Sequence, residues 1–178
     1  ILGHFFPLRR PPGRTTLSQG VGVLLALGLA GCSPLTQSGP SASAPTVPFA
    51  FWNLENLFDA EDDPDNEGDD EYLPAEEWTQ ERYALKVTHL AEAIATLDVD
   101  ILGGCEVENR RVLEDLVSHA AIAARGYQIA HLNSPDLRGI DLALLVADPV
   151  RFVGEPVLHP IDLGEGVRPT RGVLEVQV

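Results

Sequence analysis

The chain has 178 residues, with 12 Lys+Arg against 27 Asp+Glu, and its formal net charge is −15. This negative charge excludes a simple basic nucleic-acid-binding module, because such modules attract phosphate with a positive surface. A hydrophobic fraction of 44% with 22% charged residues is typical of a folded globular chain of one ordinary domain and excludes wholesale disorder. The two cysteines, Cys32 and Cys105, are too few for a disulfide-rich scaffold, and neither has a partner at zinc-ligand spacing.

The first 31 residues have the order of a bacterial secretory signal. Three arginines within residues 9–14 precede an uncharged apolar run at residues 21–30, and small residues follow it. The run is too short for a permanent membrane span, which takes about 20 residues as a helix. The sequence therefore predicts a signal peptide over residues 1–31. A short buried helix followed by an ordinary thiol is the alternative, since a brief apolar run is ambiguous by itself.

Leu29-Ala30-Gly31-Cys32 resembles the lipobox of bacterial lipoproteins, which implies that Cys32 becomes the lipid-modified first residue. Residues 32–48 are rich in Ser, Pro and Ala and predict a semi-extended tether between this anchor and the domain. The resemblance implies a protein of the bacterial cell envelope, lipid-anchored at the outer membrane or extracellular face. Loss of residues 1–31 would leave 9 basic against 27 acidic residues, a formal charge of −18.

The first half of the domain reads as a strand, an acidic loop, a helix and a second strand. Residues 48–54 are aromatic and uncharged and predict a buried strand. Residues 59–81 hold twelve acids and no Lys or Arg, which predicts a solvated loop. A helix is expected from Thr79, because apolar residues then recur at helical spacing, and residues 99–105 predict the second strand. The apolar helical positions are Tyr83, Val87, Leu90, Ile94 and Leu97.

The remainder predicts one more helix and further strands. Asn109 is a good N-cap, and we expect the helix that follows it to end at Gly126. Four more strands are expected, at residues 127–132, 140–146, 152–158 and 172–178. The order predicts an α/β fold with a mixed β-sheet and helices on one face.

Two polar residues lie at the ends of the first two strands. Asn53 falls at the end of the first and Glu106 directly after the second, and the single helix between them is long enough for a crossover that makes the strands parallel neighbours. Ligands of open α/β sheets bind at the carboxyl ends of the strands. Amide and carboxylate oxygens are hard ligands, so the pattern predicts a site for one Mg²⁺ or Mn²⁺ ion.

Three segments, residues 51–58, 100–109 and 133–145, resemble the motifs of the endonuclease/exonuclease/phosphatase superfamily, especially its secreted bacterial branch. The resemblance runs from about residue 49 to the end of the chain. It implies half of a four-layer α/β sandwich and a metal-dependent, nuclease-like phosphodiester hydrolase. By this resemblance Glu106 is the metal ligand, and Asn53 orients the scissile phosphate and the metal-bound water; both are the expected catalytic residues, and both are expected to bind the metal. Arg138 is the expected phosphate contact, with Asp141 as a further substrate-binding candidate.

The sequence departs from the family pattern in its C-terminal motifs. It contains no Gly-Asp-x-Asn segment and no closing Asp-His pair, and it begins with Ile and has no Met. Residues 49–178 are therefore expected to form an incomplete domain, inactive alone, from the N-terminal part of a larger enzyme.

Some alternatives stay open at this point. A non-catalytic acidic lipoprotein that binds divalent cations or a protein partner would share the composition. Residues 63–68 resemble the start of a calcium loop, but Pro74 stands where such a loop needs a bidentate Glu. The expected partner is a phosphodiester, whether DNA, RNA, a phospholipid or a sugar phosphate, and the expected state is a monomer.

Overall fold

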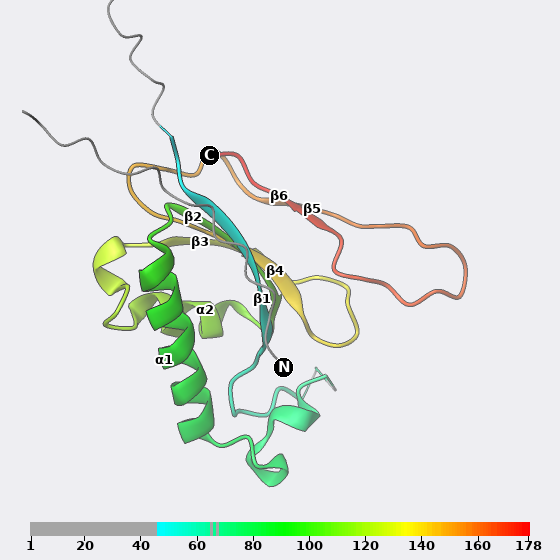
Figure 1. Ribbon diagram of the computed structural model, residues 1–178. Helices are drawn as coiled ribbons and strands as arrows, with labels where there is room; N and C mark the ends of the chain where they lie inside the picture. The colour runs from blue at the N-terminus through cyan, green and yellow to red at the C-terminus, as the bar shows by residue number, and fades with distance from the viewer. Residues whose placement is uncertain (1–45, 65, 67) are drawn as a thin grey trace, which may run out of the picture. The chain divides into compact units, whose positions relative to one another are not determined.

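The structure is a computed structural model, and it describes residues 46–64, 66 and 68–178 (Figure 1). The predicted signal peptide, the lipidation site Cys32 and most of the predicted tether lie outside the described residues. Within the described part, none of the helices combines the length and the apolar character that a membrane crossing requires.

A four-stranded mixed sheet forms the centre of the domain. Its order is β1-β2-β4-β3; β1 and β2 are parallel, whereas β4 is antiparallel to both of its neighbours. Two short strands, β5 and β6, pair as a separate antiparallel hairpin. The elements are β1 Phe49–Leu57, η1 Asp70–Tyr72, η2 Pro74–Glu76, α1 Gln80–Leu97, β2 Ile101–Val107, α2 Arg110–Ser118, η3 Ala123–Arg125, β3 Gln128–Leu132, β4 Asp141–Val146, β5 Val157–His159 and β6 Val173–Glu175, where η marks a 3₁₀ turn.

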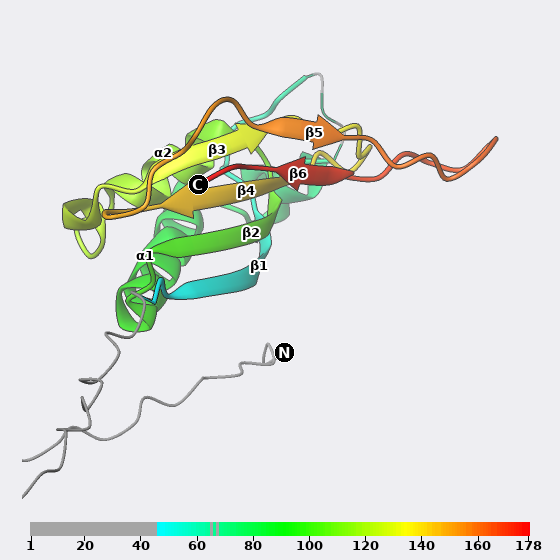
Figure 2. The same cartoon turned by 90° about the horizontal axis from the view of Figure 1, so that it is seen from above.

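The predicted α/β architecture with helices on one face is confirmed. Figure 2 shows α1 and α2 on one side of the sheet and the β5–β6 hairpin over β4 on the other. The core lies between the helices and the sheet and includes Leu90, Ile94, Leu102, Leu113 and Leu145. One helix layer and one sheet layer agree with the predicted half of a four-layer sandwich.

Helix α1 begins where the sequence predicts. Thr79 is its N-cap, and the Thr79 side chain accepts a hydrogen bond from the backbone N–H of Arg82. The predicted apolar face is buried, with Leu97 at its end only half-buried. This helix is the crossover that makes β1 and β2 parallel neighbours, as predicted.

Helix α2 begins after Asn109 as predicted, but the predicted end at Gly126 is wrong. The helix ends at Ser118, and Gly126 instead follows the short turn η3. Ile122 explains the difference, because it is buried in the core, whereas a continuing helix would turn it about 180° away from Leu113. The helix ends at Ser118 because a different backbone path is needed to bury the Ile122 side chain.

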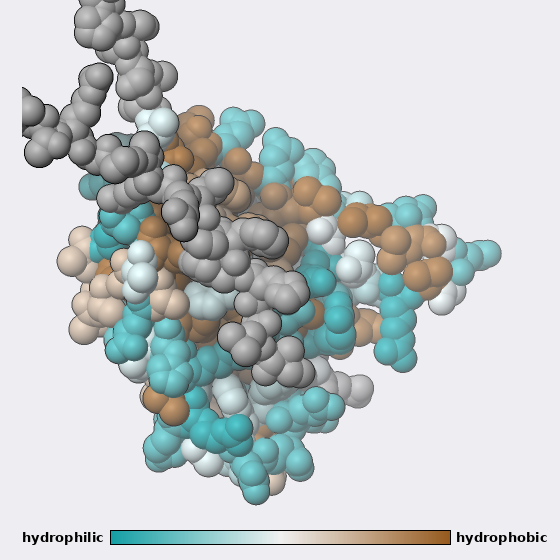
Figure 3. Space-filling model, viewed as in Figure 1, coloured by the Kyte–Doolittle hydropathy of each residue, from teal (hydrophilic) through white to brown (hydrophobic). Residues whose placement is uncertain are grey.

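Strand β1 forms as predicted, but the prediction that it is buried is wrong for one of its faces. Ala50 and Trp52 pack against the core, whereas Phe49 and Phe51 are 59% and 61% exposed on the outer face. An uncharged aromatic run cannot distinguish burial of one face from burial of both. In Figure 3 hydrophobic residues gather over the strands and along the hairpin, and hydrophilic ones at the lower end near α1 and the acidic loop.

The last two predicted strands are much shorter than expected. β5 and β6 have three residues each, and residues 152–156 are not in a strand. Gly154 with a positive φ and Pro156 interrupt this apolar segment, and such residues do not continue a strand.

Candidate active site

The parallel pairing of β1 and β2 is broken beside Glu106. Asn53 pairs with Cys105, and the next pair in register is Leu57 with Val107, so that three residues of β1 face Glu106 alone. On its other side Cys105 and Val107 pair with consecutive residues of β4, which leaves Glu106 without a partner on that strand. Relative to β4, Glu106 is therefore the extra residue of a β-bulge, a feature that re-aims a side chain, whereas relative to β1 the extra residues lie in β1.

The backbone at these strand ends has an uncommon conformation. Glu55, Asn56 and Glu106 have φ values of 54°, 59° and 62°, in the left-handed region that non-glycine residues rarely adopt. Each such residue costs on the order of 1–3 kcal/mol and persists only where its surroundings hold it. Three of them on two adjacent strand ends mark this edge of the sheet as a candidate site.

Asn53 and Glu106 lie on the same side of the sheet. Trp52 and Leu54 contact the core, so Asn53 between them faces the outer side, because side chains alternate along a strand. Leu102 and Val107 are both in the core although they are five residues apart, which shows that the bulge shifts the alternation. The structure therefore brings the two sequence-predicted residues to one edge and one face.

The hydrogen bonds of Asn53 define what its side chain can offer. Asn53 Oδ1 accepts a hydrogen bond of 2.7 Å from the backbone N–H of Glu55 and so fixes the start of the irregular segment. Among the described residues, Nδ2 has no hydrogen-bond acceptor, so this amide nitrogen is available as a donor. This suits a contact with a phosphate oxygen better than direct ligation of a metal.

Glu106 keeps its carboxylate accessible. Its side chain is 21% exposed, and its Oε1 lies 4.0 Å from Nη1 of Arg171, just before β6. A partly exposed carboxylate on a rigid strand end is a suitable hard-oxygen ligand for Mg²⁺ or Mn²⁺. The residues present therefore fit the divalent ion that the sequence predicts.

Lys86 is a site residue that the sequence analysis does not identify. Its Nζ donates hydrogen bonds to the backbone carbonyls of Glu55 and Asn56, the latter at 2.8 Å. Burial lowers the pKa of Lys86, and the carboxylates of Glu55 and Glu106 oppose this effect. Lys86 is the only lysine of the chain, and its place on α1 lets it hold the left-handed segment of β1.

Tyr72, from the acidic loop, also reaches the strand ends. Its ring stacks on Phe58 with centroids 4.2 Å apart and meets the Trp78 ring edge-on at 5.8 Å. The Tyr72 hydroxyl lies close enough to the Asn56 side chain to interact with it, and burial raises the pKa of Tyr72. The aromatic contacts therefore fix one end of the acidic loop beside Asn56.

Glu108, two residues after Glu106 in the chain, is a buried acid. Its Oε2 accepts a hydrogen bond of 2.8 Å from the backbone N–H of Asp59. Burial raises the pKa of Glu108 to about 7, and the carboxylates of Asp59, Asp69 and Asp63 add to the shift. The next residue, Asn109, caps α2 through the Val112 N–H, as predicted.

Arg138 is held by Asp136 at the turn before β4. Its Nε and Nη2 donate to the two oxygens of Asp136 at 2.9 and 2.6 Å, and this contact lowers the pKa of Asp136. The Arg138 side chain is still 63% exposed, so its remaining N–H groups can reach a ligand. A phosphate contact of Arg138 stays a prediction.

Asp141, the second substrate-binding candidate, is buried at the start of β4. Its Oδ2 lies 2.8 Å from Nε2 of His131, and its Oδ1 accepts a hydrogen bond of 2.7 Å from the Ser134 N–H. Both oxygens thus already have protein partners, which favours a role in fixing the 134–139 turn. Contact with substrate stays a prediction for this residue.

Comparison with protein families gives a match to the endonuclease/exonuclease/phosphatase family over residues 48–156, more than half of the chain. The chain belongs to this family, whose members are nuclease- and phosphatase-like hydrolases that generally depend on a divalent metal. The matched segment contains Asn53, Glu106, Arg138 and Asp141. Comparisons with curated proteins and with solved structures gave no match.

Proposed function

We propose that this protein is a Mg²⁺- or Mn²⁺-dependent phosphodiester hydrolase whose site lies at the carboxyl ends of β1 and β2. The observation that carries the proposal is the bulge that turns Glu106 out of the ladder, on the face and at the edge where Asn53 lies. Family membership supports hydrolytic phosphoester chemistry at this site.

The roles follow from the geometry. Glu106 would hold the ion, which supplies positive charge against the negative charge that develops on the phosphoryl oxygens. Asn53 donates from Nδ2 to a phosphate oxygen, and Arg138 donates from the nitrogen not used by Asp136. Lys86 keeps the segment after Asn53 in place through two carbonyl contacts. The ion, Asn53 and Arg138 would therefore stabilise negative charge on the phosphate, whereas Lys86 would position the backbone.

The net charge of the chain affects how readily an anionic substrate approaches the site. A mature chain with a formal charge of −18 repels polyanions at low salt, and screening by ions weakens that repulsion. The fold does not select among phosphodiesters. The proposed substrate is therefore a phosphodiester as a chemical class, with DNA and RNA included.

The proposed location is the bacterial cell envelope. Its support is the order of charged, apolar and small residues before Cys32, which fits export and lipid anchoring. Growth with labelled fatty acid tests it, because label should enter the wild type and not Cys32→Ser.

Hydrolysis of a generic chromogenic phosphodiester by the full-length gene product tests the activity. We expect Mg²⁺-dependent cleavage that falls by about 10²–10³-fold in Glu106→Ala. Glu114→Gln is a matched control, because Glu114 is an exposed acid of α2 that pairs with Arg110. Cleavage that survives Glu106→Ala, or needs no metal, would refute the site.

A further inference from the structure

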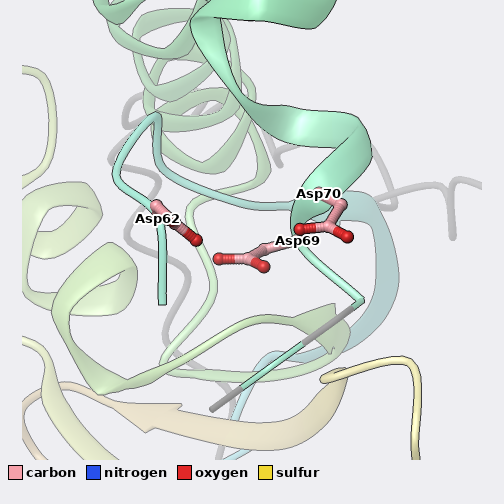
Figure 4. A group of neighbouring side chains, drawn as sticks. All are labelled: Asp62, Asp69 and Asp70. Carbon is pink, nitrogen blue, oxygen red and sulfur yellow. The ribbon is translucent and has the colours of Figure 1, made fainter. Parts of the chain in front are cut away.

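Three aspartates of the acidic loop, residues 59–81, converge outside the site described above. Asp62 follows β1, whereas Asp69 and Asp70 lie at the start of η1. One carboxylate oxygen from each lies within 4.8 Å of the other two. Figure 4 shows the Asp69 carboxylate between those of Asp62 and Asp70.

One carboxylate oxygen of Asp69 accepts no hydrogen bond from the described part of the protein. The residue is 1% exposed, and its Oδ2 accepts a hydrogen bond of 2.8 Å from the Asp63 N–H. Its Oδ1 is buried and, among residues 46–64, 66 and 68–178, is the only buried side-chain polar atom without a hydrogen-bond partner. Leaving a buried polar atom unsatisfied costs about 1–3 kcal/mol, and more when it is charged. The atom therefore points to a ligand.

The charges around the cluster favour a cation. No Lys or Arg occurs in residues 59–81; of the cations that reach the loop from outside, Arg111 is engaged with Glu61 at 2.6 Å and Arg82 donates to the Glu77 carbonyl at 2.9 Å. Within the described part of the chain, no lysine or arginine forms an ion pair with Asp62, Asp69 or Asp70. Burial raises the pKa of Asp69, so a proton would be the competing way to neutralise it.

We propose that Asp62, Asp69 and Asp70 bind a Ca²⁺ ion that stabilises the acidic loop. Calcium accepts six to eight oxygen ligands in flexible geometry, and the exposed Asp62 and Asp70 leave room for water to complete the shell. Mg²⁺ demands a near-ideal octahedron and fits such a set less well. The site is separate from Glu106, and the proposal does not depend on the hydrolytic activity.

A cation at this position would act on segments that reach the strand ends. The turn η1 begins at Asp70 and ends at Tyr72, whose hydroxyl contacts Asn56. Gly68 packs so closely on the backbone of Arg138 that a Cβ there would collide with it. The ion would therefore help to fix these two contacts of the acidic loop with the rest of the domain.

Thermal unfolding of the full-length gene product, stripped with a chelator, tests the proposal. Addition of about 5 mM Ca²⁺ should raise the Tm by roughly 3–6 °C, with Mg²⁺ giving less. Asp69→Asn and the double variant Asp62→Asn/Asp70→Asn should lose this rise. The double variant changes only exposed residues, so it is expected to fold. Glu76→Gln removes an exposed acid of the same loop outside the cluster and should keep the rise.

A second measurement separates this site from the strand-end site. Glu106→Gln should retain the Ca²⁺-dependent rise in Tm even where it abolishes hydrolysis. Tb³⁺ in place of Ca²⁺ should luminesce on excitation of the nearby Tyr72 and Trp78 in the wild type, and about tenfold less in the double variant. An absent rise in Tm, or one equal in the wild type and the double variant, would overturn the proposal and leave a protonated Asp69.

Discussion

The ends of β1 and β2 and the acidic loop both present oxygen ligands, but they are built differently. At the strand ends the side chains come from a paired sheet, and Lys86 and the 2.7 Å bond from the Glu55 N–H to Asn53 hold an irregular backbone in place. In the acidic loop three carboxylates meet without a basic partner among the described residues, and one buried oxygen has no hydrogen bond.

The strand ends and the acidic loop therefore illustrate two different ways of building a metal site. A strained but well-supported backbone aims a few groups at a reacting centre, which suits catalysis. A cluster of unpaired carboxylates on a loop instead gains order when a cation binds, which suits stability. Changes at the strand ends should therefore alter activity first, and changes in the acidic loop should alter stability first.

Asn53→Ala should have as large an effect on activity as Glu106→Ala. Loss of the Nδ2 donor should reduce hydrolysis by about 10²–10³-fold, because the group contacts charge that develops in the transition state. The Mg²⁺ concentration for half-maximal activity should stay near that of the wild type, since Nδ2 does not ligate a metal. A large increase in that concentration would instead make Asn53 a metal ligand.

Lys86→Met tests whether α1 holds the left-handed segment of β1, at Glu55 and Asn56, in place. The substitution leaves the carbonyls of Glu55 and Asn56 without their charged donor, and hydrogen bonds to charged groups contribute about 1.5–3 kcal/mol. We expect a loss of that size in the free energy of unfolding, measured with urea. Glu92→Gln, on the exposed face of the same helix, should cost less than about 0.5 kcal/mol. Equal losses in both variants would remove the special role of Lys86.

Gly68→Ala tests the contact between the acidic loop and the 134–139 turn. The added Cβ would collide with the backbone of Arg138, so the acidic loop or the 134–139 turn must shift. Overpacking of this kind costs about 1–3 kcal/mol, and we expect the lower half of this range because the contact lies near the surface. A melting curve unchanged from that of the wild type would show that the acidic loop does not press on this turn.

Arg138→Gln gives the smallest expected effect, one that depends on pH. The contact with Arg138 lowers the pKa of Asp136 in the folded state below its ordinary 3.8. The stabilisation is therefore fully present above pH 3.8 and is lost as the pH falls through the folded-state pKa. We expect a deficit of about 0.5–1 kcal/mol near neutral pH, because Arg138 is largely exposed. In melting experiments the deficit should shrink below pH 3.8, and a constant deficit would mean that the pair does not cause it.

Local patterns predict the helices and the strand pairing well. The apolar face of α1, its Thr79 cap, the Asn109 cap and the parallel pairing of β1 with β2 follow from spacing and crossover length. The end of α2 was not predictable in the same way, because burial of Ile122 outside the helix depends on tertiary packing.

The positions of Asn53 and Glu106 could be predicted, but the way in which they are held could not. The bulge and the left-handed residues Glu55 and Glu106 leave no mark in the sequence pattern, and only Asn56 is of a type that often adopts positive φ. The roles of Lys86 and Tyr72 depend on contacts over more than a dozen residues of separation. A lone lysine in an otherwise acidic stretch was the one signal that could have pointed to Lys86.

Anomalous diffraction from crystals of the full-length gene product grown with Mn²⁺ would locate the ion directly. We expect an ion about 2.0–2.2 Å from the Glu106 carboxylate, with the Asn53 side chain turned toward the same centre. An ion bound elsewhere with Glu106 empty, or an Asn53 side chain on the opposite face of the sheet, would contradict the proposed site.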